Sequence, residues 1–156
     1  MNQAIQDIIQ RLDNTLTGDP WFGRSAQSLL QEIDPELVFR HPGNNGHSIA
    51  ELLWHMITWA QFTLDRLDKK QEPDMAAFET LDWRNIDPQI HSWKKGLSEF
   101  ESVHKKIITI LTTKDDSFLN EKVDYRNYSF QFLLNGLIEH TIYHLGQIAF
   151  IHKLLH

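Results

Sequence analysis

Two histidines near the end of the chain, His140 and His144, have the spacing of a helical metal site. Residues four apart lie one above the other on the same face of an α-helix, so both imidazoles can face one ion. The spacing alone is weak evidence, because nine histidines in 156 residues produce about half such a pair by chance. A second pair, His152 and His156, indeed occurs at the end of the chain.

The surroundings of the first pair strengthen the metal interpretation. On a helical wheel His140 and His144 belong to an apolar stripe in which they are the only polar members. The other members of the stripe are Leu133, Leu137, Ile148, Ile151 and Leu155. Two adjacent imidazoles buried without partners cost about 1–3 kcal/mol each. A metal ion, or a dense hydrogen-bond network, would remove that cost.

His55 is the candidate third ligand, because it too is a lone imidazole on an apolar helix face, with Leu52, Trp59 and Phe62 on the same side. Three neutral imidazoles leave coordination positions open, as a reactive site requires. The chain contains no cysteine, so Zn²⁺, Ni²⁺ or Fe²⁺ suits this set of ligands better than Cu⁺.

Four further residues have roles that the sequence leaves open. Gln147, one turn after the histidine pair, is placed to hydrogen-bond a ligand or a bound water. Tyr143 is a candidate proton donor or a packing residue, and these two are the candidate catalytic residues. His104 is a fourth ligand, a group behind the ligands or a core histidine, with the last two favoured. Glu51 is a helix cap or a group that orients a ligand.

Helical periodicity runs through most of the chain and predicts the elements that position these residues. We expect helices over about 5–16, 22–33, 49–68, 88–111 and 129–155. Residues 69–87 have little regular periodicity and are expected to form a connection that supplies pocket walls together with Trp59 and Trp83. Long helices joined by crossover-length connections predict an all-α protein, a four-helix bundle in one domain over residues 1–156.

Composition narrows the classes of partner. The net charge of −6 does not favour nucleic acid or an anionic membrane. The absence of cysteine excludes disulfides and thiolate nucleophiles. The N-terminal residues do not resemble a secretory signal, and no uninterrupted apolar stretch reaches about 18 residues. We therefore expect a soluble cytoplasmic protein without nucleic-acid or membrane partners.

Two separated stretches resemble the DinB/YfiT-like superfamily of metal-dependent enzymes: "PGNNGHSIAELLWHMITW" and "NYSFQFLLNGLIEHTIYHLGQIAFI". The most specific pattern is HxxxHxGQI, which is matched by His140, His144, Gly146, Gln147 and Ile148. The resemblance implies a four-helix bundle with up-down-down-up connectivity. It also implies a divalent metal held between helices by His55, His140 and His144.

The resemblance further implies a homodimer. The last helix fits this expectation, because it has a second apolar face that would supply a further burial surface. That face consists of Leu134, Ile138, Ile142 and Ala149.

The function that the resemblance implies is Lewis-acid chemistry on a small-molecule substrate. The chain is similar to transferases that activate a low-molecular-weight thiol such as bacillithiol or mycothiol on Zn, Ni, Fe or Mn, and to hydrolases that activate water. Thiol transfer is the favoured alternative. A non-catalytic metal-binding or stress-response protein, and a structural helical dimer with hydrogen-bonded core histidines, are the other interpretations.

Overall fold

The computed structural model describes residues 2–71 and 74–156. Within these residues the secondary structure consists of six α-helices and one short 3₁₀ helix, with no β-strand. The elements are α1 (Gln3–Thr17), α2 (Ala26–Glu32), α3 (Ile49–Leu67), α4 (Met75–Asp82), α5 (Trp93–Leu111), η1 (Asp116–Asn120) and α6 (Phe130–Leu155). The prediction of an all-α fold is confirmed.

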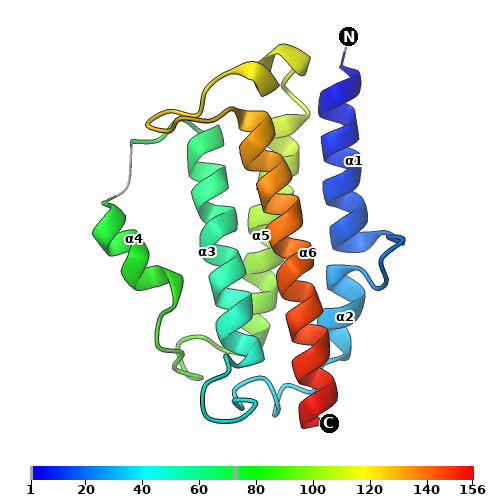
Figure 1. Cartoon of the computed structure of the whole chain (residues 1–156), viewed down its shortest axis with the longest axis vertical. Helices are drawn as coiled ribbons and strands as arrows, with labels where there is room; N and C mark the ends of the chain where they lie inside the picture. The colour runs from blue at the N-terminus through cyan, green and yellow to red at the C-terminus, as the bar shows by residue number, and fades with distance from the viewer. Residues whose placement is uncertain (1, 72–73) are drawn as a thin grey trace.

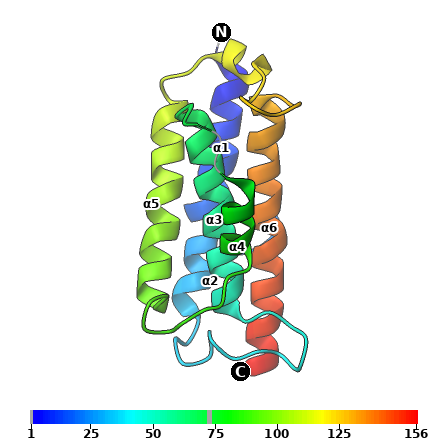
Figure 2. The same cartoon turned by 90° about the vertical axis from the view of Figure 1, so that its left-hand side faces the viewer.

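Four long helices lie side by side and enclose the core (Figures 1 and 2). Helix α3 packs against α5 and α6, and α1 packs against the same two helices from the other side. In Figure 1, α1 and α6 run downwards, whereas α3 and α5 run upwards. The short α2 lies below α1, and α4 lies outside the four long helices, against α3. Helices α3 and α6 are thus direct neighbours, as a site shared between them requires.

Three of the four long helices begin with a serine that caps their first turn. Ser48, at the start of α3, accepts a hydrogen bond from the backbone N–H of Glu51, and the carboxylate of Glu51 accepts one from the backbone N–H of Ser48. The predicted capping box is therefore confirmed. At the starts of α5 and α6, Ser92 and Ser129 each accept one hydrogen bond from the backbone N–H three residues later. These caps fix where each site-bearing helix begins.

Two helices begin later than predicted. Asp87 does not start α5, because its backbone carbonyl accepts from the N–H groups of Ile90 and His91 and closes a turn. Helix α5 begins only at Trp93. Similarly, α2 begins at Ala26 because Ser25 caps it. In both cases a local turn or cap ends the connection after the point that the sequence pattern indicated.

Helix α6 is the longest helix, and two of its faces are covered within the chain. Leu134 and Ile138 are 1% and 2% exposed, and Ile142 and Ala149 pack partly buried against the core. The face that we expected to be free for a second copy is therefore used internally, because α6 lies between α3 on one side and α1 and α2 on the other. The large apolar side chains that α6 exposes are Phe132, Tyr143, Phe150 and Leu154.

Although α6 is long and apolar, it does not qualify as a membrane span. No helix in the described part of the chain combines the length and the apolar character that crossing a bilayer requires.

The connection over 69–87 contains a helix that we did not predict. Helix α4 is only eight residues long and has no buried residue, so its pattern is too short to be recognised by periodicity. Residues 72 and 73 of this connection lie outside the described part of the chain. The expectation of an irregular segment is wrong for the eight residues of α4.

Candidate metal centre

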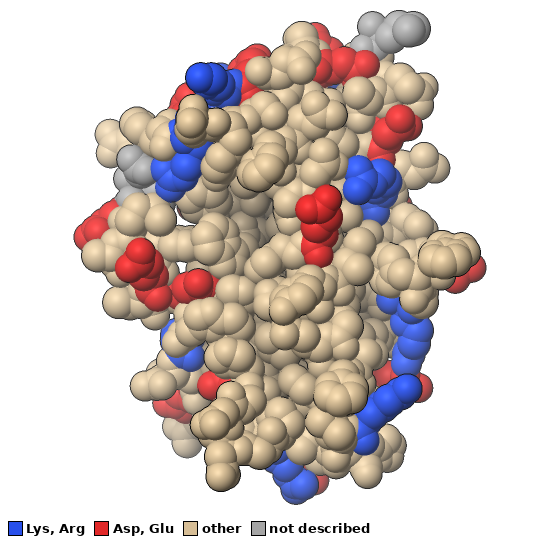
Figure 3. Space-filling view, viewed as in Figure 1, with Lys and Arg blue, Asp and Glu red and all other residues tan. Residues whose placement is uncertain are grey.

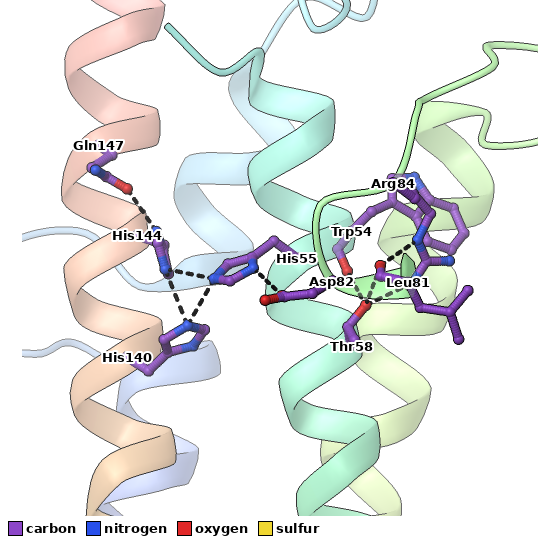
Figure 4. Close-up of polar contacts among 9 residues, drawn as sticks. All are labelled: Trp54, His55, Thr58, Leu81, Asp82, Arg84, His140, His144 and Gln147. Atoms are coloured by element: carbon purple, nitrogen blue, oxygen red, sulfur yellow. Dashed lines mark hydrogen bonds and ion pairs between the residues drawn. The ribbon is translucent and has the colours of Figure 1, made fainter. Parts of the chain in front are cut away.

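The three histidines predicted as ligands lie together between α3 and α6, and we call them the histidine cluster (Figure 4). His55 comes from α3, and His140 and His144 come from successive turns of α6. Nε2 of His55 lies 3.0 Å from Nε2 of both other rings, and the Nε2 atoms of His140 and His144 are 3.1 Å apart. The Nε2 atoms of all three rings thus face a common centre.

Two of the three rings are held from behind by side chains that accept a hydrogen bond. His55 Nδ1 donates to Asp82 Oδ1 at 2.5 Å, and His144 Nδ1 donates to Gln147 Oε1 at 2.6 Å. A proton on Nδ1 leaves Nε2 with its lone pair, which is the form of imidazole that binds a metal. A carboxylate or carbonyl behind a histidine is also the usual arrangement around ligating histidines.

The arrangement fits a bound cation better than a hydrogen-bond network. If Nδ1 carries the proton on His55 and His144, their Nε2 atoms are both acceptors and cannot hydrogen-bond each other. If His140 carries its proton on Nε2, it donates to one of these two atoms, but the lone pairs of His55 and His144 still face each other 3.0 Å apart. Such lone pairs repel unless a positive charge lies between them. Nitrogens this close can contact one ion together, because nitrogen ligands lie about 2.0–2.1 Å from zinc.

The surroundings keep the rings neutral. Burial, together with the neighbouring His144 and His55, lowers the pKa of His140 to about 3. Burial also lowers the pKa of His144, against the opposing effect of its bond to Gln147. For His55 burial lowers the pKa although the carboxylate of Asp82 opposes it. Neutral rings are the state in which imidazole donates a lone pair to a metal.

Trp83 covers the cluster on the side of α4. Its ring stacks on His55 with centroids 3.8 Å apart, and His47 stacks on its other face at 3.9 Å. The indole also meets His144 edge to face at 6.3 Å. The prediction that Trp83 forms part of a wall at the site is consistent with this position. Such stacking excludes water from the covered face of His55.

The segment that carries Asp82 and Trp83 is held to α3 by a small set of contacts. Phe78 of α4 meets Trp59 edge to face, with centroids 4.9 Å apart. Arg84 Nη2 donates to Thr58 Oγ1 at 2.6 Å, and Arg84 Nε donates to the carbonyl of Leu81 at 2.9 Å (Figure 4). Thr58 is one turn from His55 on α3, so these bonds place Asp82 behind that ligand.

The candidate catalytic residues occupy different positions. Gln147 lies behind His144, on the ring edge opposite to Nε2, where it orients the ring. Tyr143 is 64% exposed, and its ring meets that of His144 edge to face at 5.0 Å. Their catalytic roles stay predictions.

Glu51 and His104 do not join the cluster. The carboxylate of Glu51 caps α3 and pairs with His41 and His47 at 3.2 and 3.6 Å. It therefore reaches the site only indirectly, through the stack of His47 on Trp83. His104 is 1% exposed within α5, and its Nδ1 donates to the carbonyl of Phe100 at 2.7 Å. It is a core histidine, one of the two roles favoured for it.

Asp82 is the site residue that the sequence did not reveal. It lies 27 positions after His55, in a segment without apolar periodicity. The available signal was indirect, since a long connection between helices often covers a functional site. Among the described residues, no group pairs with the buried Nδ1 of His140, so the third ring lacks the partner that the other two have.

Comparison with known proteins agrees with the geometry. A search of curated proteins finds no match. The family model described as "DinB superfamily" matches residues 22–148, a stretch that includes all three histidines of the cluster as well as Asp82. Since this match covers more than half of the chain, the protein belongs to the DinB superfamily.

Proposed function

We propose that this protein is a metal-dependent enzyme in which His55, His140 and His144 hold one divalent cation. The observation that carries the proposal is the meeting of three neutral Nε2 atoms 3.0–3.1 Å apart. Zn²⁺ and Ni²⁺ suit a set of imidazole ligands, and Fe²⁺ and Mn²⁺ are the alternatives. When bound, the cation lowers the pKa of a thiol or a water and so supplies a nucleophile near neutral pH.

The protein's own residues prepare the site for this chemistry. Asp82 and Gln147 hold the protons of His55 and His144 on Nδ1, so that Nε2 faces the centre of the cluster. Trp83 shields the outer face of His55 from water. Three protein ligands leave room for a small molecule, which a purely structural tetrahedral site does not.

Metal content is the decisive test of this proposal. Purified protein, as isolated and after incubation with Zn²⁺, Ni²⁺, Mn²⁺ or Fe²⁺ and desalting, should retain about one ion per chain by elemental analysis. The variants His55→Ala and His144→Ala should retain none under the same conditions. Wild-type protein without stoichiometric metal after all four incubations would overturn the proposal.

The reaction is tested next, on the metal-loaded protein. We propose transfer of a low-molecular-weight thiol to an electrophile, because thiol activation is the chemistry favoured by the resemblance. A panel of small thiols with monochlorobimane, run beside ester and amide substrates, separates thiol transfer from hydrolysis. Turnover that requires both the metal and one thiol supports thiol transfer. Turnover of esters or amides without thiol assigns water as the nucleophile, and no turnover in any assay supports a non-catalytic metal-binding protein.

Three related expectations belong to the same proposal. We propose that the four long helices form an up-down-down-up bundle, which the helix directions in Figure 1 support. We also propose that the chain acts as a single cytoplasmic domain and pairs as a homodimer. Since the second apolar face of α6 is used internally, a dimer that pairs through α6 would use its exposed side chains, namely Phe132, Tyr143, Phe150 and Leu154.

A further inference from the structure

An apolar groove begins at the histidine cluster and runs between α3 and α6, away from Trp83. Its volume is about 270 Å³. Its lining is mostly apolar and aromatic: Trp59, Thr63, Tyr128, Phe132, Leu133, Gly136, Leu137 and His140. One member of the cluster, His140, therefore forms part of the wall. The groove is a different space from the face of His55 that Trp83 covers.

The groove follows directly from the register of the two helices. On α3, Trp59 and Thr63 lie one and two turns beyond His55, and on α6 Gly136 and Leu137 lie one turn before His140. The ring of Trp59 meets that of His140 edge to face at 6.3 Å. The wall is thus continuous with the ligands themselves.

The lining offers no charged partner to an anionic occupant. None of the residues in the wall is acidic, lysine or arginine. The hydroxyl of Thr63 already donates to the carbonyl of Trp59 at 3.0 Å, so this side chain presents little free polarity to the groove. In the metal-free protein an anion would find no lysine or arginine of the wall to pair with and would also meet a chain with net charge −6. Figure 3 shows a mainly uncharged surface over this face, hollowed above its centre.

Gly136 keeps the groove open. A Cβ atom built at this position meets no other heavy atom within 4 Å. Glycine in the middle of a helix is destabilising by about 0.5–1 kcal/mol relative to alanine, and no close backbone contact demands it here. The missing side chain instead contributes empty space one turn from His140.

We propose that this groove binds the uncharged aromatic or aliphatic part of the substrate and delivers its reacting end to the histidine cluster. The proposal rests on the proposed function, since it names the substrate class of the same centre. A volume of about 270 Å³ lies just below the range of about 300–1,000 Å³ typical of sites for drug-sized ligands. The occupant is therefore a small organic group of one or two rings, or an equivalent alkyl chain.

The test uses metal-free full-length protein, so that it does not depend on the metal. Two probes share a ring system and differ in charge: 2-naphthalenemethanol, which is neutral, and 2-naphthoate, which is an anion. Their dissociation constants are measured by isothermal titration calorimetry. We expect the neutral probe to bind at least about tenfold more tightly than the anion.

Two glycines of the same helix provide a matched pair of variants. Gly136→Leu fills the groove, whereas Gly146→Leu places the same side chain on α6 at a second position where a Cβ meets nothing within 4 Å, outside the groove. Both changes raise helix propensity. Gly136→Leu should weaken binding of 2-naphthalenemethanol by at least about tenfold, and Gly146→Leu by less than about twofold.

Several results would overturn the proposal: no binding of the neutral probe to wild-type protein, equal affinity for the two probes, or unchanged affinity in Gly136→Leu. Metal retention, measured in parallel, keeps the two proposals distinguishable. If Gly136→Leu keeps its metal and loses the probe, the groove is supported independently of the reaction. If wild-type protein binds the probe but no metal, the groove stands while the proposed function fails.

Discussion

His104 and the histidine cluster place imidazoles in the interior of the same helical protein by two different means. His104 stays within its own helix, where the carbonyl of Phe100, one turn earlier, accepts its Nδ1 proton. The cluster draws one ring from α3 and two from α6, and two of its rings are supported by Asp82 and Gln147. His104 thus takes its one hydrogen-bond partner from its own helix, and its Nε2 has none among the described residues, whereas the three converging rings are held by residues from several elements.

The sharpest way to break this comparison is to remove one ring from each region. His140→Ala should weaken Zn²⁺ affinity by at least about a thousandfold, near 4 kcal/mol, because one of only three protein ligands is lost. His104→Leu should leave the affinity unchanged. Competition with a fluorescent zinc chelator measures both constants, and an equal loss in the two variants would contradict the distinction.

The second prediction concerns the response of His104 to acid. Burial lowers the pKa of His104 from 6.5 to about 4, although its bond to Phe100 opposes the shift. Because the unfolded chain then binds the proton more readily, the stabilisation is complete above pH 6.5 and is lost as the pH falls towards 4. The loss amounts to about 3 kcal/mol in the free energy of unfolding.

Urea unfolding of metal-free wild type and His104→Leu between pH 7 and 4 measures this contribution. The cluster titrates in both proteins, so the difference between the two curves belongs to His104. The free energy of unfolding of the wild type should fall more steeply, and parallel curves would show that His104 is not held neutral by the fold.

The third prediction concerns Asp82, which accepts a hydrogen bond from His55 Nδ1. Asp82→Ala should weaken Zn²⁺ binding by about 10–100-fold, the usual effect of removing a partner of a ligating histidine. Asp82→Asn should recover part of the loss, because an amide oxygen can still accept from His55 Nδ1. Glu79→Ala, which removes the same charge from an exposed position on the same helix, is the control and should bind as wild type.

The smallest expected change in Zn²⁺ affinity comes from removing Gln147, the uncharged side chain that holds His144. Gln147→Leu should weaken Zn²⁺ binding by about tenfold, at the low end of the range for such partners, because an amide stabilises the Nδ1 proton of His144 less than a carboxylate would. The measurement is the same chelator competition. A loss larger than that of Asp82→Ala would mean that Gln147 acts on the bound small molecule and not only on the ring.

How much of this could be predicted from sequence depended on whether a residue belongs to a buried face. His55, His140 and His144 each interrupt an apolar stripe, so periodicity placed them correctly on α3 and α6. Asp82 interrupts nothing, because no residue of α4 is buried. Its position follows from the contacts of Phe78 and Arg84 with α3, which are tertiary and leave no periodic pattern.

Periodicity also could not show that the second apolar face of α6 is covered within the chain. Leu134 and Ile138 were recognised as apolar, but periodicity alone does not say whether a second apolar face meets another copy or another helix of the same chain. Here α1 and α2 cover it. The start of α5 was displaced for a simpler reason, since Asp87 suits a turn as well as it suits a helix cap.

The separation of α4 from the core has a consequence for how this protein can change over evolutionary time. Because α4 buries none of its residues, most of its positions, apart from Phe78 with its contacts to Trp59 and Phe62, are less constrained by packing than the four long helices. The segment nevertheless carries a carboxylate that contacts His55 and an indole that stacks on it. Substitution of Asp82 or Trp83 can thus alter the surroundings of His55 while the interior of the four long helices stays as it is.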